Sequence, residues 1–402
     1  MASLPIAPAN GLVDDLAGYS WSGAPTMVEL RDVGGKAVPY CINEFWTARQ
    51  RQGHALHEVS YRACFKPQLP AFFIERLTRP GDRVYDPFMG RGTTPLQAAL
   101  MDREAIGNDV NPLSAMLCRP RLAPPTLEQV GQRLSEIQWD AAIAHPALRV
   151  FYHPDTLREI EALRLHFSAA ERSGTLDATD DWIRMVATNR LTGHSSGFFS
   201  VYSLPPNQAV SLEAQRRINR KHGQVPPRRE VPAIILKKTR ALLKDGPPPG
   251  VRHRFLTGPA EHTPSLPEGS VDLVVTSPPF LDIVQYAADN WLRCWFAGID
   301  VASVAIAHHR KVEDWTAWTR QVLCELARVV RPGGHLCYEV GEVRNGAVEL
   351  DRQVIEAMQG LPFEPLCVVV NAQAFTKTAN CWGVANNARG TNTNRIVVAR
   401  RV

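Results

Sequence analysis

The stretch RVYDPFMGRGTTPLQAAL, residues 83–100, decides the fold of this 402-residue chain. An apolar run ends at Asp86, glycines follow at 90 and 92, and apolar residues then recur at helical spacing. This pattern predicts a strand, a tight turn and a helix. The stretch EAIGNDVNP, residues 104–112, predicts a second short strand that ends near Asp109. Together they indicate a βαβ unit with a parallel sheet.

The glycine-rich turn suits a ligand that approaches the backbone closely, at the free N–H groups of a helix N-terminus. A dinucleotide fingerprint requires a third glycine where this chain has Pro95, and a P-loop requires a lysine that is absent here. Asp109, at the end of the next strand, suits a ribose diol. Ribose without pyrophosphate favours S-adenosylmethionine, and a purely structural use of the glycines is the alternative.

A third stretch, VDLVVTSPPF, residues 271–280, runs from an apolar strand directly into two prolines and an aromatic ring. Ligands of parallel sheets lie off the carboxyl ends of the strands, so Ser277 to Phe280 should lie beside the glycine-rich turn. Between these motifs, residues 121–250 show helical patterns and a polar, irregular stretch, and the α/β alternation resumes only near residue 252.

The strings DPFMGRGTT and TSPPF together resemble the DNA amino-methyltransferases, which methylate an exocyclic nitrogen of cytosine or adenine. The resemblance covers most of residues 55–115 and 252–402. It implies an α/β fold of the S-adenosylmethionine-dependent methyltransferase type, Rossmann-like and doubly wound, with a mostly parallel seven-stranded sheet. The division it implies is an N-terminal arm (1–40), a catalytic domain (41–120 and 251–402) and a helical, basic target-recognition insertion (121–250).

The same resemblance assigns site residues. The cofactor-binding residues would be Lys66, Pro67, Asp86, Pro87, Phe88, Gly90, Gly92, Thr93, Thr94 and Asp109. The catalytic residues would be Ser277, Pro278, Pro279 and Phe280. One position departs from the family: Pro259 stands where an acidic residue is frequent, and the nearby Glu261 is not assigned its role.

The residue types of the tetrapeptide Ser277 to Phe280 suit a target base that is flipped out of the duplex. Phe280 can stack on the flipped ring, while the Ser277 hydroxyl and the Pro278 carbonyl each accept one N–H of the amino group. Transfer would be direct, without a covalent intermediate, and would gain chiefly from positioning. Serine at the first position resembles the cytosine-N4 subgroup. Adenine-N6 methylation is the alternative, and an RNA amino-methyltransferase or an inactive DNA-binding subunit are further rivals.

The net charge of +5 is concentrated in the insertion, where residues 216–240 hold nine lysines and arginines against one acid, Glu230. Such a basic segment suits phosphate contacts. The predicted DNA-binding residues are Arg216, Arg217, Arg220, Lys221, Arg228 and Arg229. A solvated basic helix face is the alternative. The polar and aromatic stretch 188–203 could contact base edges, or it could be a structural loop.

The eight cysteines form no C-x-x-C pair, which predicts reduced core thiols and no zinc site. No apolar run approaches the roughly 20 residues that span a membrane, and the N-terminus lacks an export signal. We therefore expect a cytoplasmic enzyme, bacterial or phage-encoded, that acts as a monomer or weak dimer on double-stranded DNA. It would work beside a cognate restriction endonuclease or alone.

Overall fold

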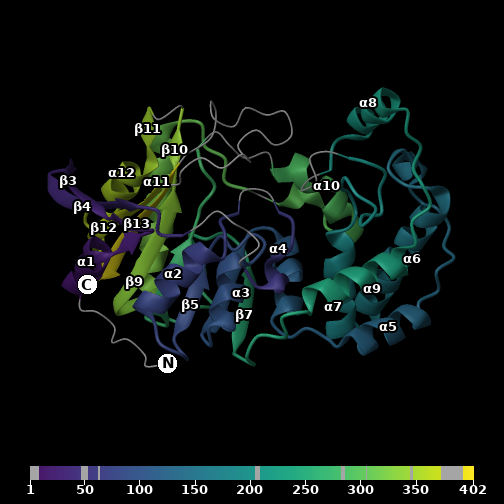
Figure 1. Cartoon of the computed structure of the whole chain (residues 1–402), viewed down its shortest axis with the longest axis horizontal. Coiled ribbons are helices and arrows are strands. Elements are labelled where there is room, and N and C mark those ends of the chain that lie inside the picture. The colour runs from purple at the N-terminus through teal and green to yellow at the C-terminus, as the bar shows by residue number, and fades with distance from the viewer. Residues whose placement is uncertain are drawn as a thin grey trace.

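The computed structural model describes residues 9–46, 53–61, 64–203, 209–281, 286–304, 306–344, 347–372 and 393–402. Figure 1 shows a twisted sheet covered by helices, with a group of further helices on the right. None of the helices in these ranges is long and apolar enough to cross a membrane.

The central sheet has nine strands in the order β3-β4-β12-β13-β9-β8-β5-β6-β7. Its parallel half consists of β5 (Arg83–Asp86), β6 (Glu104–Asp109), β7 (His253–Thr257), β8 (Val271–Thr276) and β9 (Val330–Val340). Next to β9, β13 (Thr393–Arg401) runs antiparallel between β9 and β12 (Phe363–Ala372). The predicted α/β class with a mostly parallel sheet is confirmed. The stretch RPGG, residues 331–334, lies within β9, although its proline and glycines are typical of a turn.

The sheet has two strands more than the predicted seven, and both come from the predicted N-terminal arm. Strand β4 (Lys36–Asn43) pairs in parallel with β12, and β3 (Met27–Val33) pairs antiparallel with β4. Gly34 and Gly35 turn the chain between them with φ of 61° and 81°, as a two-residue hairpin turn requires. The sequence did not predict these strands because Pro39 and the glycines are typical of loops, yet β4 buries Val38, Tyr40 and Cys41.

Two apolar layers cover the two faces of the sheet. Helices α2 (Gln68–Leu77), α3 (Thr93–Leu100) and α4 (Pro112–Cys118) belong to one layer, together with α1 (Ala9–Gly18). Helices α11 (Val312–Val329) and α12 (Leu350–Ala357) belong to the other. Short hairpins add β1 (Ser20–Trp21) with β2 (Ala24–Pro25), and β10 (Glu342–Val343) with β11 (Val348–Glu349).

The predicted insertion is helical and packs beside the sheet. It comprises α5 (Leu127–Glu136), α6 (Pro154–Ser173), α7 (Ala178–Thr188), α8 (Leu212–His222) and α9 (Val231–Leu242). Helix α10 (Tyr286–Ala297), which follows the TSPPF motif in sequence, lies with these helices (Figure 1). The indole of Trp182 donates to Thr239 at 3.1 Å, and Arg184 donates to the Ala297 carbonyl at 2.6 Å. These bonds join α7 to α9 and to α10.

The seven cysteines within the described residues are free thiols. Five of them are buried, as predicted for core thiols, whereas Cys324 is exposed on α11 and Cys64 is half-buried. Cys381 lies outside the described residues.

Asn371 fastens the chain that leaves β4 to the end of β12. Its side-chain oxygen accepts from the backbone N–H groups of Phe45 (2.7 Å) and Trp46 (3.2 Å). We predict that Asn371→Leu destabilises the fold by about 1–3 kcal/mol for each of these donors that finds no other acceptor. Denaturant unfolding measures the loss. Asn43→Ala is the matched control, because Asn43 is the register partner of Asn371 but bonds at the surface. Equal stability of both variants would contradict the role of Asn371.

Candidate active site

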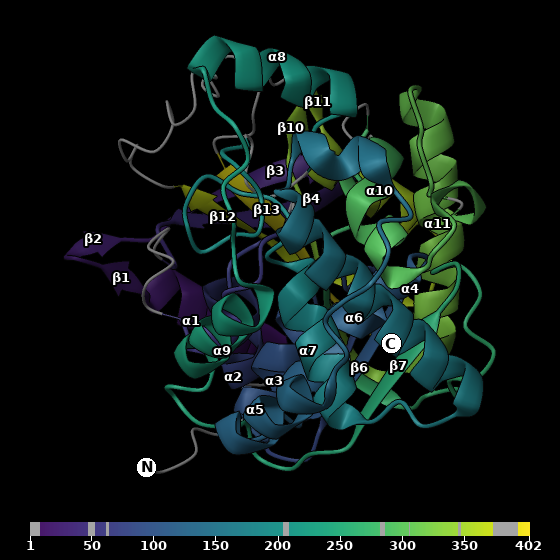
Figure 2. The same cartoon turned by 90° about the vertical axis from the view of Figure 1, so that its right-hand side faces the viewer.

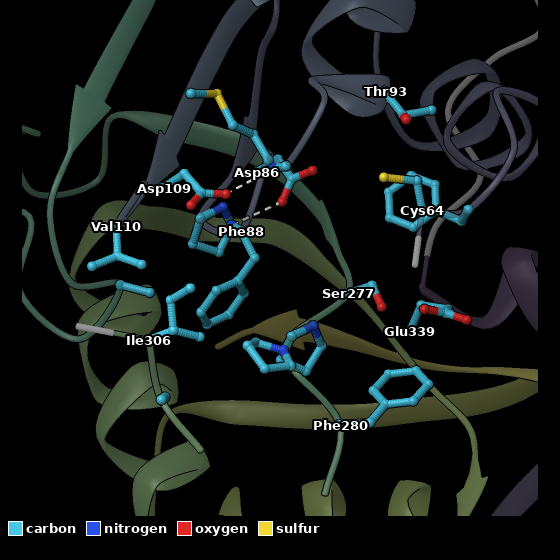
Figure 3. A pocket seen from close by; sticks show the side chains of 18 of the residues that line it. Cys64, Asp86, Phe88, Thr93, Asp109, Val110, Ser277, Phe280, Ile306 and Glu339 are labelled. Carbon is cyan, nitrogen blue, oxygen red and sulfur yellow. Dashed lines mark hydrogen bonds between the residues drawn. The ribbon is translucent and has the colours of Figure 1, made fainter. Parts of the chain in front are cut away.

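A cavity of about 300 Å³ lies at the carboxyl ends of the parallel strands (Figure 3). Residues from the glycine-rich turn, from the ends of β6 and β7, and from the TSPPF motif line it together. The lining includes Asp86, Pro87, Phe88, Gly90, Thr93, Asp109, Ser277, Pro278, Pro279 and Phe280. Two motifs about 190 residues apart therefore share one cavity, as expected for a parallel sheet.

The glycine-rich turn follows β5 and lies against β6. Two backbone N–H groups of the turn donate hydrogen bonds to β6. Met89 donates to the Asn108 carbonyl and Gly90 donates to the Asp109 carboxylate, both at 2.9 Å. Gly92 has φ of 76°, and a Cβ atom there would lie 2.2 Å from the Cys118 sulfur. Both the backbone angle and the space at this position therefore require glycine.

Asp109 lies at one end of the cavity, next to Val110 (Figure 3). One carboxylate oxygen accepts from Gly90 and the other accepts from the backbone N–H of Asn111 at 2.9 Å. Burial raises the pKa of this carboxyl group, and the two backbone N–H donors oppose that rise. The bonds fix the carboxylate where a hydroxyl-bearing ligand would meet an acceptor.

Asp86 joins the two motifs. Its Oδ1 accepts from the Thr276 hydroxyl at 2.6 Å and from the Phe88 backbone N–H at 3.0 Å. Thr94 adds a second connection by donating to the Val275 carbonyl at 3.0 Å. Burial raises the pKa of Asp86 to about 7. The end of β5 and the end of β8 are thus held together at the floor of the cavity.

The TSPPF tetrapeptide follows β8 and forms one wall of the cavity. The buried indole of Trp315, on α11, donates to the Pro279 carbonyl at 2.9 Å and fixes the proline pair. Phe280 and Ser277 both lie on this wall (Figure 3). The loop therefore presents a hydroxyl, carbonyls and a ring, and its prolines contribute no N–H.

Residues 29–114 match a family model described as DNA methylase. The Type II methyltransferase M.MjaII of Methanocaldococcus jannaschii is 32% identical over 89 residues, which are 22% of this chain and 16% of that protein. The Type II methyltransferase M.MvaI of Kocuria varians is 30% identical over 96 residues, 23% of this chain and 20% of that one. These matched segments are similar to DNA amino-methyltransferases, the family that the two sequence motifs resemble.

The matched segments span a fifth or less of the length of these two curated relatives. Among solved structures, TrmN from Thermus thermophilus aligns at 15% identity over 85% of this chain and 50% of that chain, with a TM-score of 0.32. A geranyl diphosphate methyltransferase in complex with SAM aligns at 11% identity over 84% and 86%, with a TM-score of 0.34.

The similarity to DNA methylases supports S-adenosylmethionine, the predicted cofactor, and the described residues fit it. The cavity volume reaches the range of about 300–1,000 Å³ typical of small-ligand sites. The glycine-rich turn leaves no room for a side chain at Gly92, and Asp109 supplies a fixed carboxylate. No group of His, Cys, Asp and Glu within the described residues could hold a metal ion.

The family motifs do not include Glu339, which sequence reasoning missed. It lies on β9, where the pairing of Thr276 with Tyr338 places it beside Ser277, and it lines the cavity. Its carboxylate accepts from the Asn394 side-chain amide at 2.7 Å, and the Ser277 hydroxyl lies beside it (Figure 3). Burial raises the pKa of Glu339 to about 7, and these two polar neighbours oppose that rise. A glutamate within the apolar run HLCYEV is unusual, and it was the feature of the sequence that could have indicated this residue.

Two arginines hold a covering segment over the glycine-rich turn. Arg91, between the two glycines, donates to the Val59 carbonyl at 2.9 Å and to the Phe65 carbonyl at 3.2 Å. The fully buried Arg121 donates to the Leu56 carbonyl at 3.1 Å and to the Arg91 carbonyl. Tyr61, Cys64 and Phe65 of this segment line the cavity.

The remaining predicted cofactor residues lie behind or beside the cavity and do not line it. Lys66 is half-buried, and burial together with Arg91 lowers its pKa. Pro67 precedes the first turn of α2. Gly92 and Thr94 support the turn from behind. Pro259 and Glu261, at the position that departs from the family, both line the cavity.

The predicted DNA-binding residues fall into two groups. Arg216, Arg217, Arg220 and Lys221 are exposed on α8, which lies at the top of the molecule in both Figure 1 and Figure 2. Arg228 instead forms an ion pair with Glu159, and Arg229 is half-buried with its backbone N–H bonded to Thr156. The assignment of these six residues to DNA stays a prediction.

We predict that Gly92→Ala abolishes cofactor binding or folding, whereas Gly81→Ala retains both. The two glycines have similar φ, 76° and 86°, but a Cβ at Gly81 meets nothing within 4 Å. Gly81→Ala should therefore lower the free energy of unfolding only by the cost of placing alanine in a left-handed backbone conformation, about 1 kcal/mol. Calorimetric titration with S-adenosylmethionine and thermal unfolding measure both effects. A Gly92→Ala variant that binds cofactor normally would show that the turn tolerates a side chain.

Proposed function

We propose that this chain methylates DNA at N4 of cytosine, taking the methyl group from S-adenosylmethionine after the target base has left the duplex. One observation carries the proposal. The Ser277 hydroxyl lies on the wall of the candidate cofactor cavity, beside the buried carboxylate of Glu339 (Figure 3). Such methylation would protect DNA from a restriction endonuclease that recognises the same site, or would act as a mark by itself.

The cofactor, when bound, supplies an electrophilic methyl group on a sulfonium. Asp109 would hold the ribose end, and the glycine-rich turn would lie along the ligand with its backbone. The Asp86–Thr276 bond keeps this end of the cavity at a fixed position relative to Ser277. Positioning of the reacting atoms is the main contribution that such a rigid arrangement makes.

The target amino group would be held by acceptors. With its hydrogen donated to Glu339, the Ser277 hydroxyl would keep its lone pairs for one N–H of the base, and the Pro278 carbonyl would accept the other. Phe280 is placed to stack on the ring. Two acceptors on one amino group draw the nitrogen toward a tetrahedral geometry, which frees its lone pair for the methyl group.

The proton that leaves the nitrogen needs an acceptor. We assign it to Glu339: the nitrogen gives its proton to the Ser277 oxygen as Ser277 gives its own to the Glu339 carboxylate. Serine alone is a poor base at neutral pH, and a carboxyl group whose pKa is about 7 accepts more readily than an ordinary glutamate. Glu339 thus acts on the base through Ser277.

Nucleoside mass spectrometry tests the function. The purified protein is incubated with S-adenosylmethionine that carries a labelled methyl group, and with unmethylated plasmid DNA or total RNA. Labelled N4-methylcytosine in DNA is the expected product. Labelled N6-methyladenine would overturn the choice of base, and label confined to RNA would overturn the choice of polymer.

We predict that Glu339→Gln lowers kcat about 100-fold and removes the pH dependence of kcat/KM near neutrality. In the wild type, kcat/KM for S-adenosylmethionine should rise with pH through about 7, as Glu339 ionises in the free protein. Glu261→Gln is the matched control, because Glu261 lines the same cavity. Rate measurements from pH 5.5 to about 8.5 separate the variants. A wild-type profile that survives in Glu339→Gln would exclude Glu339 as the acceptor.

The same variant should be more stable than the wild type at alkaline pH. The pKa of Glu339 is raised in the folded state from 4.5 to about 7, so unfolding releases a proton in this window and stability falls as pH rises through it. Above this window Glu339→Gln should gain on the order of 3 kcal/mol of unfolding free energy. Thermal unfolding of both proteins at acidic and alkaline pH measures the gain, and no gain would mean that Glu339 is readily ionised.

A further inference from the structure

Arg190 is a half-buried cation whose buried Nε has no hydrogen-bond acceptor among the described residues. It follows α7 at the start of the stretch 190–203, and its guanidinium lies 4.2 Å from the centre of the Phe198 ring. Its Nε is buried, and no residue in the described part of the chain accepts a hydrogen bond from it. The backbone is fixed as well, because the Arg190 carbonyl accepts from Phe199 at 2.8 Å.

The neighbours of Arg190 are mainly cationic. Arg293, on α10, donates to the Ser60 carbonyl at 2.9 Å, and Lys238, on α9, forms an ion pair with Glu58 at 3.0 Å. Burial and repulsion from Arg293 lower the pKa of Arg190 to about 10, and Glu58 acts in the opposite direction. Glu58 is therefore already paired with Lys238.

This cluster lies next to the candidate active site. The Arg293 guanidinium is 5.8 Å from the centre of the Tyr61 ring, and Tyr61 lines the cavity. One side chain, that of Arg293, thus links the Arg190 group to a residue of the cavity wall. A ligand bound at Arg190 would be adjacent to whatever enters the cavity.

A buried donor that no acceptor satisfies, such as the Arg190 Nε, is unfavourable, and two neighbouring guanidinium groups repel each other. Both penalties are relieved by an anion. The planar fork of arginine fits phosphate oxygens in a bidentate manner, and the ring of Phe198 holds the fork in place. The missing partner should therefore be a phosphate group.

We propose that Arg190, stacked on Phe198 and next to Arg293, binds a backbone phosphate of DNA beside the nucleotide whose base enters the cavity. This site rests on the proposed function and gives it a specific DNA contact. It differs from the exposed arginines of α8, which would attract any polyanion. Arg190 holds one phosphodiester at a fixed distance from Ser277 and thereby positions the target.

The test compares Arg190→Gln and Arg190→Lys with Arg252→Gln. Arg252 is an exposed arginine next to the amino end of β7, so its variant removes the same charge far from the carboxyl ends of the strands. Binding of a fluorescent DNA duplex is measured by anisotropy across a KCl series. Arg190→Gln should bind about ten-fold more weakly, and its slope of log K against log salt should fall by about one. Arg190→Lys should retain most of the slope.

Plasmid methylation supplies the second measurement. Arg190→Gln should raise KM for DNA and leave KM for S-adenosylmethionine unchanged. Duplex affinity and salt slope equal to those of Arg252→Gln would overturn the proposal, and a lower thermal stability alongside them would assign Arg190 to packing. A phosphate-dependent rise in the melting temperature that needs Arg190, without any effect on duplex binding, would indicate a free anion instead and would also overturn it.

The two proposals can fail separately. A wild type that binds DNA through Arg190 but transfers no methyl group would refute the proposed function and leave the phosphate site standing. A wild type that methylates plasmid DNA, with Arg190→Gln equal to it in KM and salt slope, would refute the phosphate site alone.

Discussion

The hydrogen bond between Asp86 and Thr276 holds the candidate site together. It joins the ends of β5 and β8, which the chain separates by about 190 residues and by the whole helical insertion. The parallel sheet brings the two strand ends to the same edge, and this bond sets their spacing at the level of side chains. The glycine-rich turn and the proline-rich loop begin directly after the bonded residues, so their relative positions depend on it.

The electrostatics of the cavity favour a cation. Asp86, Asp109 and Glu339 all line it, and burial raises the pKa of each. No lysine, arginine or histidine is among the described lining residues. Three carboxyl groups that are difficult to ionise in an empty pocket would ionise more readily beside a positive sulfonium. Burial disfavours the ionised form of these carboxyl groups in the empty cavity. The same groups would therefore complement the charge of a cationic ligand once it is bound.

The sequence predicted best those parts of the site that are made by the backbone. DPFMGRGTT and TSPPF fix chain geometry through glycine and proline, and such constraints are visible in the residue types themselves. Glu339 and Trp315 were missed because their roles depend on neighbouring strands and helices, which no local pattern reveals. Strands β3 and β4 were missed for the same reason: β4 exists because β12 offers it an edge. Among the predicted DNA-binding residues, Arg228 forms an ion pair with Glu159, which lies 69 residues away in the sequence.

Buried arginines show how structure separates support from binding. Arg91 and Arg121 direct their guanidinium groups at backbone carbonyls of the covering segment, and these carbonyls provide acceptors for their donors. Arg190 is also held in place, by Phe198 and by its own backbone, but its buried Nε has no acceptor among the described residues. A fixed position with donors bonded to backbone carbonyls is typical of a structural arginine. A fixed position with an unsatisfied donor, near a second cation that contacts the cavity wall, is the arrangement expected of a site whose acceptor arrives with the substrate.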